Sequence, residues 1–347
     1  MTQFCRGEAG LTRDSLLEAK AVGRFLRRAV LVLGGVVALA AAAAAVAITW
    51  ARVEVKAQAT PLPPAEMVAK APASTELPTR VSWINTASQF VPRSALIDPS
   101  GDPDAGAWSR MSFPAFVLEW ADGRILLVDA GMDGPAARAF GAPIERVIGA
   151  DPIEPLVDVA AALGRARDRV AGIVFTHLHD DHVQGIESLC RASARPIEAL
   201  VATPQAEHPM YMTRGGLHAV QTSPCLHFTQ LPAGPVVDLP GFPGVSVVAA
   251  AGHTPGTQLV VAHLGARGPH PIVLAGDVVN SYDGIELDVP KPWLYRLLVV
   301  PEDDERLGEL RRYLHDLVQR FGATVLVSHD QAALETSGVT AFDAPRP

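Results

Sequence analysis

A histidine-rich run directly after a short apolar stretch constrains this chain more than any other feature. Residues 170–175 are apolar and predict a buried strand, and residues 176–182 then read THLHDDH. His177 and His179 are two positions apart in an extended segment, so their side chains point to the same side. Imidazole nitrogens and carboxylate oxygens suit a divalent metal such as zinc, whose catalytic sites keep one position open for water. The run therefore predicts a metal site at the end of a strand.

Three more ligand-type residues follow apolar stretches in the same way. His253 comes after the run 245–250, Asp277 closes the run 272–277, and His329 closes the run 325–329. Each signal is weak alone, because a single His or Asp at a strand end is more often a cap or a surface residue. Together with the first run they indicate one metal centre built at the strand ends of an α/β protein.

The pattern after residue 80 alternates short apolar runs with helical stretches, which predicts an α/β or α+β fold. Residues 116–128 predict a hairpin, because Asp122-Gly123 lies between two apolar runs. Helices are predicted over 154–168 and 303–320. The other predicted strands cover residues 199–202, 245–250, 258–263, 271–275 and 324–327.

Near the N-terminus, 23 residues from Ala29 to Ala51 carry no charge. At ~1.5 Å per residue this length exceeds the roughly 30 Å hydrocarbon core of a bilayer. The basic residues before it are Arg6, Arg13, Lys20, Arg24, Arg27 and Arg28, and those shortly after it are Arg52 and Lys56. The positive-inside rule then predicts a cytoplasmic segment over 1–28 and an extracytoplasmic chain, periplasmic or at the cell surface, beyond the transmembrane anchor at 29–51.

A cleaved signal peptide is the main alternative to an anchor. Signal peptides have shorter apolar regions of about 7–15 residues, but residues 57–59 read Ala-Gln-Ala and offer a small-residue cleavage site, which would give a secreted protein. A buried soluble helix is disfavoured, because the stretch has no polar face. Residues 52–79 are rich in Pro and Ala and predict a linker, which places the folded domain at 80–347.

The net charge and the number of cysteines disfavour two classes of protein, nucleic-acid binders and disulfide-rich or cysteine-zinc proteins. The formal net charge of −8 disfavours a nucleic-acid-binding protein. Three cysteines are too few for a disulfide scaffold or a cysteine zinc site, and they leave open at most one bridge, between Cys190 and Cys225.

The four motifs together resemble the metallo-β-lactamase superfamily. Residues 177–182 match its HxHxDH motif, residues 252–256 its second histidine motif, residues 276–277 its bridging aspartate and residues 328–329 its last histidine, in the same order. The resemblance covers about residues 110–335. It implies an αββα sandwich with the metal ligands on loops at one edge, here preceded by one transmembrane helix.

The resemblance also implies two divalent metal ions, with Zn²⁺ the expected metal. One ion would be held by His177, His179 and His253, the other by Asp181, His182 and His329, and Asp277 would bridge both. Asp129 corresponds to an aspartate that usually lies behind the ligands. Asp180 is interpreted as a helix N-cap or as another residue behind the ligands, because the motif register selects Asp181.

The implied reaction is hydrolysis by a hydroxide that bridges the ions, with Asp181 and Asp277 as the catalytic carboxylates. Asp277 is normally absent from true β-lactamases, so its presence favours the ester, thioester, lactone and phosphodiester hydrolases. The motif around His253 looks most like the lactonase and glyoxalase II branches, yet Thr257 stands where glyoxalase II commonly has a histidine. We expect a lactone or carboxylic ester as the small-molecule substrate, with Tyr282 as a substrate contact.

Other interpretations remain open at this point. They are a β-lactamase, a glyoxalase II-like thioester hydrolase, an iron oxygenase and a metal-binding sensor without turnover. Nothing in the sequence indicates the oligomeric state. Residues 203–244 are a candidate lid, although His208, His218 and His227 within it are expected at the surface, and Trp293 and Tyr295 are candidates to border the cleft.

Overall fold

The computed structural model describes residues 13–193, 195–265 and 270–343, and it divides into the units Met1–Trp50 and Ala51–Pro347. Helix α1 (Arg13–Ala57) contains the uncharged run, and its part Arg27–Ala57 is long and apolar enough to cross a membrane. The prediction of one apolar N-terminal helix is therefore confirmed. Residues 1–12 of the predicted cytoplasmic segment lie outside the described residues.

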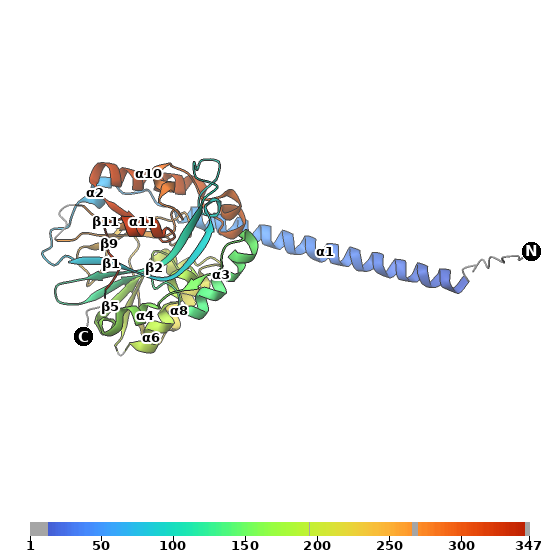
Figure 1. The fold of residues 1–347 in the computed structure, drawn as a ribbon, viewed down its shortest axis with the longest axis horizontal. Helices are drawn as coiled ribbons and strands as arrows, with labels where there is room; N and C mark the ends of the chain where they lie inside the picture. The colour runs from blue at the N-terminus through green and yellow to red at the C-terminus, as the bar shows by residue number, and fades with distance from the viewer. Residues whose placement is uncertain (1–12, 194, 266–269, 344–347) are drawn as a thin grey trace, which may run out of the picture. The chain divides into compact units, whose positions relative to one another are not determined.

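Twelve strands in the described part of the second unit form two sheets (Figure 1). The first sheet has the order β4-β1-β2-β3-β5-β6-β7, and the second has the order β12-β11-β10-β9-β8. The first-sheet strands are β1 (Arg80–Pro92), β2 (Trp108–Glu119), β3 (Ile125–Val128), β4 (Glu154–Pro155), β5 (Val170–Val174), β6 (Ile197–Val201) and β7 (Leu226–Gln230). The second-sheet strands are β8 (Val236–Asp238), β9 (Val245–Ala249), β10 (Gln258–Ala262), β11 (Ile272–Leu274) and β12 (Thr324–Leu326).

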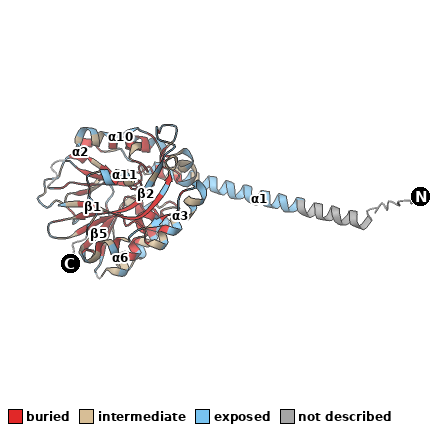
Figure 2. Cartoon of the chain, viewed as in Figure 1, coloured by how far each residue is buried: buried red, intermediate tan, exposed pale blue. Residues whose placement is uncertain are grey.

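Alternating side chains of the strands supply the core between the sheets. Phe116 and Leu118 of β2 pack with Val247, Val260 and other residues of the second sheet. Val117 points the other way and packs under the helices, as the two-residue period of a strand requires. Figure 2 shows the strands largely buried between helices that expose one face.

Helices cover both outer faces of the pair of sheets (Figure 1). On the first sheet lie α4 (Val159–Leu163), α6 (Ile186–Ala192) and α8 (Arg214–Thr222), and α3 (Gly134–Ile148) packs at one end. On the second sheet lie α2 (Ala65–Ala69) and α10 (Asp304–Phe321). The remaining helices are α5 (Asp180–Val183), α7 (Thr203–Glu207), α9 (Asp283–Glu286), α11 (Gln331–Thr336) and the short turns η1 (Arg93–Ala95), η2 (Gly164–Arg169) and η3 (Tyr295–Val299). This is the predicted αββα sandwich.

The predicted hairpin is confirmed, since β2 and β3 pair antiparallel with Phe116 opposite Val128. The predicted helix over 154–168 is wrong in its bounds. Residues 154–155 form β4 and pair with β1, and the helix begins only after Asp158, whose carboxylate accepts a hydrogen bond from the backbone N–H of Ala161. Gly164, with φ of 55°, then ends this helix after five residues.

The expected linker is partly packed onto the second unit. Ala65, Val68 and Ala69 of α2 are buried against the α10 side of the second sheet. Residues 65–69 are therefore not an arm without regular structure. Their apolar side chains pack against the second sheet, and their spacing in the sequence did not predict this contact.

The stretch 203–244 consists mainly of α7, α8, β7 and β8, so most of it belongs to the sandwich rather than to a lid. His218 and His227 are exposed, as expected, while His208 is half-buried with Nδ1 3.5 Å from Glu54. Cys190 and Cys225, 35 positions apart, are joined by a disulfide that links α6 to the segment before β7.

Candidate metal centre

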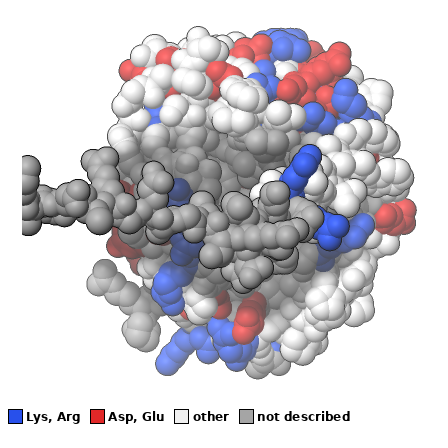
Figure 3. Space-filling view, turned by 90° about the vertical axis from the view of Figure 1, so that its right-hand side faces the viewer, with Lys and Arg blue, Asp and Glu red and all other residues white. Residues whose placement is uncertain are grey.

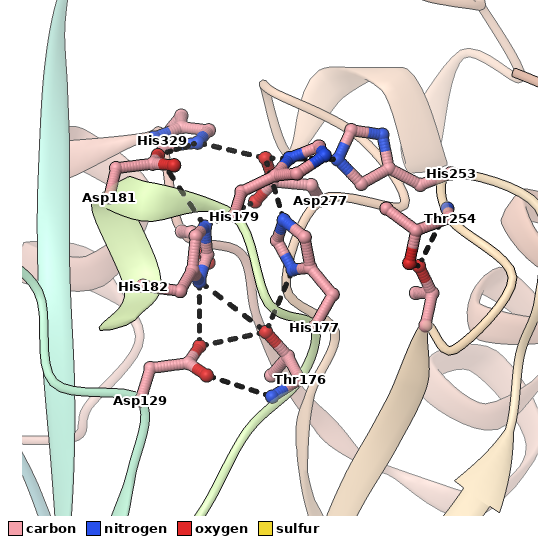
Figure 4. Close-up of polar contacts among 12 residues, drawn as sticks. Asp129, Thr176, His177, His179, Asp181, His182, His253, Thr254, Asp277 and His329 are labelled. Atoms are coloured by element: carbon pink, nitrogen blue, oxygen red, sulfur yellow. Dashed lines mark hydrogen bonds and ion pairs between the residues drawn. The ribbon is translucent and has the colours of Figure 1, made fainter. Parts of the chain in front are cut away.

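The seven predicted ligand residues follow strands of both sheets: five lie on loops, and Asp181 and His182 lie in the short helix α5. His177, His179, Asp181 and His182 follow β5, His253 follows β9, Asp277 follows β11 and His329 follows β12. All seven side chains are buried. The same edge of the sandwich therefore receives every one of them, because the carboxyl ends of these strands meet there (Figure 4).

Their ligand atoms form two groups that share one residue. The first group is His177, His179, His253 and Asp277, and the second is Asp181, His182, Asp277 and His329. Within each group the candidate ligand atoms all lie within 4.8 Å of one another. This spacing is small enough for the atoms of each group to surround a single divalent ion.

Asp277 stands between the groups. Its Oδ2 lies 3.0 Å from Nε2 of His329 and 3.6 Å from Nε2 of His253, while its Oδ1 lies 3.2 Å from Nε2 of His182. The preceding Gly276 has φ of 52°, and a Cβ there would lie only 2.7 Å from the hydroxyl of Thr176. Glycine is thus required for the turn that brings the carboxylate between the imidazoles.

Several buried atoms of the centre have no hydrogen-bond partner among the described residues. They include Nε2 of His177, Nε2 of His182 and Oδ1 of Asp277. Leaving such atoms unsatisfied in a protein interior is costly unless another group binds them. A mixed set of imidazole and carboxylate donors with unused lone pairs fits divalent transition metals.

Asp129 orients one of the imidazoles from behind. Its Oδ2 lies 2.8 Å from Nδ1 of His182, and its carboxylate also accepts hydrogen bonds from the backbone N–H and the hydroxyl of Thr176 (Figure 4). Because a carboxylate accepts, Nδ1 of His182 carries a proton, and Nε2 is the ring nitrogen that faces Asp277. The position expected from the sequence for Asp129 is therefore the one it occupies.

Lys291 and Glu302 support His253 in the same manner, and sequence reasoning missed both. Oε1 of Glu302 lies 2.5 Å from Nδ1 of His253 and 2.6 Å from the ammonium of Lys291. The ammonium also donates a hydrogen bond to the backbone oxygen of Asp277, at 2.5 Å. The only sequence signal was a pair of charged residues between apolar stretches, which does not reveal that both are buried.

Burial and neighbouring charges set the protonation of the imidazoles. Burial lowers the pKa of His179 from 6.5 to about 3 and lowers the pKa values of His177 and His253 as well, which keeps these rings neutral. Burial works in the same direction on His182, but the carboxylates around it, led by Asp181, raise its pKa overall. Neutral imidazoles are the form that binds metals.

Asp180 takes a different place from the one expected. His179 occupies the N-cap of α5, and Asp180 is an exposed residue in the first turn of that helix. The helix begins at Asp180, one residue earlier than expected, and the extended His179 stands at its N-cap. Asp180 is therefore not an N-cap.

Two tyrosines differ in their relation to the centre. Tyr282 is half-buried and packs against the apolar cluster under α10. Burial raises the pKa of Tyr295 well above its usual value, and the negative charges of Glu302, Asp277 and Asp181 add to the rise. The ammonium of Lys291, which hydrogen-bonds to the backbone of Asp277, lies 5.3 Å from the centroid of the Tyr295 ring.

Comparison with known proteins agrees with this geometry. The model of the metallo-beta-lactamase superfamily matches residues 114–326. No curated protein sequence matches the chain. Among solved structures, an N-acyl homoserine lactone hydrolase with the product N-hexanoyl-L-homoserine bound at its catalytic metal centre shares 17% identity, with a TM-score of 0.54, over 75% of this chain and 96% of that one.

A second similar structure is B. thuringiensis AiiA with N-decanoyl-L-homoserine bound at the active site. It is 17% identical, with a TM-score of 0.54, over 75% of this chain and 96% of that one. At this level of identity the likeness shows the shared fold. Since the family model spans more than half of the chain, the protein described here belongs to the metallo-beta-lactamase superfamily.

Proposed function

We propose that the protein is a dinuclear metal-dependent hydrolase that acts on lactones or carboxylic esters. The observation that carries the proposal is the pair of His/Asp groups that share the Asp277 carboxylate. One Zn²⁺ ion would be held by His177, His179 and His253, and a second by Asp181, His182 and His329, with Asp277 between them. The substrate class is supported by the similar N-acyl homoserine lactone hydrolase and by AiiA with N-decanoyl-L-homoserine bound at its active site.

Protein groups around the ions prepare the reaction. When bound, two divalent cations lower the pKa of water between them and polarise the substrate oxygen. Asp129 and Glu302 hold His182 and His253 in the tautomer that leaves Nε2 free. The buried walls of the centre keep bulk water out and strengthen every polar interaction inside it.

Tyr295 is the side chain that we assign to substrate contact, in place of Tyr282. A tyrosine hydroxyl is protonated at neutral pH, so it can donate a hydrogen bond. A donor close to Asp277 and Asp181 suits the carbonyl oxygen of an ester or lactone, where negative charge develops during attack. Tyr282 packs against the apolar cluster under α10.

We also propose that the catalytic domain, residues 80–347, lies outside the cytoplasm, held by the helix over 29–51 or released if that segment is cleaved. The apolar helix and its basic flank support this topology. The disulfide between Cys190 and Cys225 adds support, because such bonds persist in oxidising compartments.

The test is a substrate panel with defined metal content. Full-length protein in detergent is stripped of metal, reloaded with Zn²⁺ and assayed on acyl lactones, aryl esters, nitrocefin and a glutathione thioester. We expect the lactones or esters to be hydrolysed fastest, and Tyr295→Phe to lose more activity than the control Tyr282→Phe. Preference for nitrocefin or the thioester would contradict the substrate class, and two bound ions without any turnover would indicate a sensor.

A further inference from the structure

The last turns of α1, residues 51–57, belong to the second unit and pack within it. Ala51 and Val55 are buried in a small apolar cluster with Met210. The guanidinium of Arg52 donates a hydrogen bond to the backbone oxygen of Arg296, at 3.0 Å. Ala51 is also the last residue of the uncharged run. Because the apolar stretch ends at Ala51, the surface around Ala51 is the part of the second unit that is covalently joined to that stretch.

Two segments flank this helix end, and each exposes large apolar side chains. Tyr211 follows Met210 directly and is 46% exposed. On the segment that carries Arg296, the exposed fractions are 59% for Trp293, 49% for Leu294 and 51% for Val299. We call these four residues the apolar rim. Three of them lie within seven positions of one another, which is unlike the scattered apolar residues of an ordinary soluble surface.

The segment that carries the rim also reaches the metal centre. Lys291 lies at its start and hydrogen-bonds to the backbone of Asp277. Tyr295 lies in its middle, with its ring centroid 5.3 Å from the ammonium of Lys291, and the turn Tyr295–Val299 is a π-helix. Such turns are frequent at functional sites. One face of the segment thus serves the centre while the other presents apolar side chains beside the helix end.

We propose that the apolar rim sits in the headgroup region of the bilayer, so that the metal centre receives amphiphilic substrates, with a hydrolysable polar head and an acyl chain, directly from the membrane surface. This rests on the membrane anchoring proposed above. Trp and Tyr are the residues that favour the membrane–water interface. Ala51 ends the proposed membrane anchor, so the apolar rim around it would lie near the lipid surface.

Charge near the rim agrees with an anionic lipid surface. Arg52 and Lys56 lie on the same helix end, with Glu54 between them, and the Lys56 side chain is 60% exposed although its ammonium lies 3.9 Å from Asp303. Figure 3 shows Lys and Arg side chains among uncharged ones on this side of the protein, with acidic side chains chiefly toward the edge. Basic groups beside apolar side chains strengthen binding at an anionic interface.

The experiment measures the depth of Trp293 in lipid. Full-length protein is reconstituted into vesicles of phosphatidylcholine and phosphatidylglycerol with brominated acyl chains, which quench nearby tryptophans. Every variant carries Trp50→Phe, because Trp50 is the next-to-last residue of the uncharged run and would also be quenched. The comparison is between this parent, Trp293→Ser and the control Trp108→Ser, whose tryptophan is 45% exposed on β2.

We expect brominated lipid to quench the parent and the Trp108→Ser variant, and expect Trp293→Ser to lose most of the quenching. Equal quenching in the parent and in Trp293→Ser would overturn the inference while leaving the anchoring intact. Vesicle flotation is run beside it, and a chain that fails to float would overturn both the anchoring and the inference. Neither readout depends on turnover, so hydrolase activity is tested separately.

Discussion

The carboxylate of Glu302 lies 2.5 Å from Nδ1 of His253, a candidate metal ligand 49 positions earlier in the chain. The same oxygen accepts a hydrogen bond from Lys291, whose ammonium also holds the backbone of Asp277. This buried pair therefore connects the loop that follows β9 with the loop that follows β11. Its contribution to the centre is to fix the direction of one imidazole and the path of the chain at Asp277.

We expect Glu302→Gln to weaken metal binding. The amide preserves the shape but removes the charge that holds the proton on Nδ1 of His253, and loss of such a partner typically costs roughly 10–100-fold in metal affinity. Competition with a chromophoric chelator measures the affinity. Glu187→Gln is the matched control, because Glu187 is exposed on α6 and pairs only with Arg191 among the described residues. Equal metal affinities of the two variants would show that Glu302 does not support metal binding by His253.

Acid is expected to destabilise the metal-free protein through His179. Burial lowers the pKa of His179 to about 3 in the folded state, from 6.5 in the unfolded chain, so only the unfolded chain takes up a proton between these values. The stability contribution is present above pH 6.5 and is lost as the pH falls. For this single group the loss is about 2 kcal/mol between pH 7 and pH 5.

Urea unfolding at both pH values measures this loss, with His179→Gln as the comparison. The free energy of unfolding should fall more steeply for the wild-type protein than for the variant. Parallel pH profiles would show that His179 is accessible to protons in the folded state.

A fragment that begins at Ala51 should be more stable than a fragment that begins at Gln58. Removal of residues 1–50 leaves the apolar cluster of Ala51, Val55 and Met210 intact. Removal of residues 1–57 deletes Val55, whose full burial is worth about 2 kcal/mol, and the hydrogen bond from Arg52 to Arg296. Thermal melts of the two soluble fragments should show a lower Tm for the shorter one. Identical melting would mean that the helix end contributes nothing to the fold.

The disulfide predicts a sensitivity to reductant. Cys190 and Cys225 lie 35 positions apart, and closing a loop of this size stabilises the fold by roughly 2–4 kcal/mol. Dithiothreitol should therefore lower the Tm of the wild-type protein and leave that of a Cys190→Ala/Cys225→Ala variant unchanged. Protein purified from its native compartment with both thiols free would contradict the extracytoplasmic topology.

Much of the site was predictable because its ligands lie in short motifs at strand ends. Each of these motifs follows an apolar strand: the run 177–182, His253, Asp277 and His329. The resemblance to the family predicted that their side chains form one metal centre. Strand positions were equally clear, since residues such as Phe116 and Val117 alternate between the two cores.

The missed features depend on contacts that no local pattern encodes. Lys291 and Glu302 look like ordinary surface charges until the fold buries them against His253. Tyr282 was expected as a substrate contact from the family pattern after Asp277, and that expectation stays a prediction. The helix over 154–168 failed because pairing of residues 154–155 with β1 displaces helical hydrogen bonding there.

The most direct test of the account is the metal content of the wild-type protein and of Asp277→Ala, measured after reconstitution with Zn²⁺ and beside hydrolysis of an acyl lactone. Because both groups of ligands share Asp277, we expect two ions per chain in the wild-type protein and fewer than two in the variant. The variant should also lose most of its turnover, while its circular dichroism spectrum shows an intact fold. Two tightly bound ions and full activity in Asp277→Ala would contradict the account.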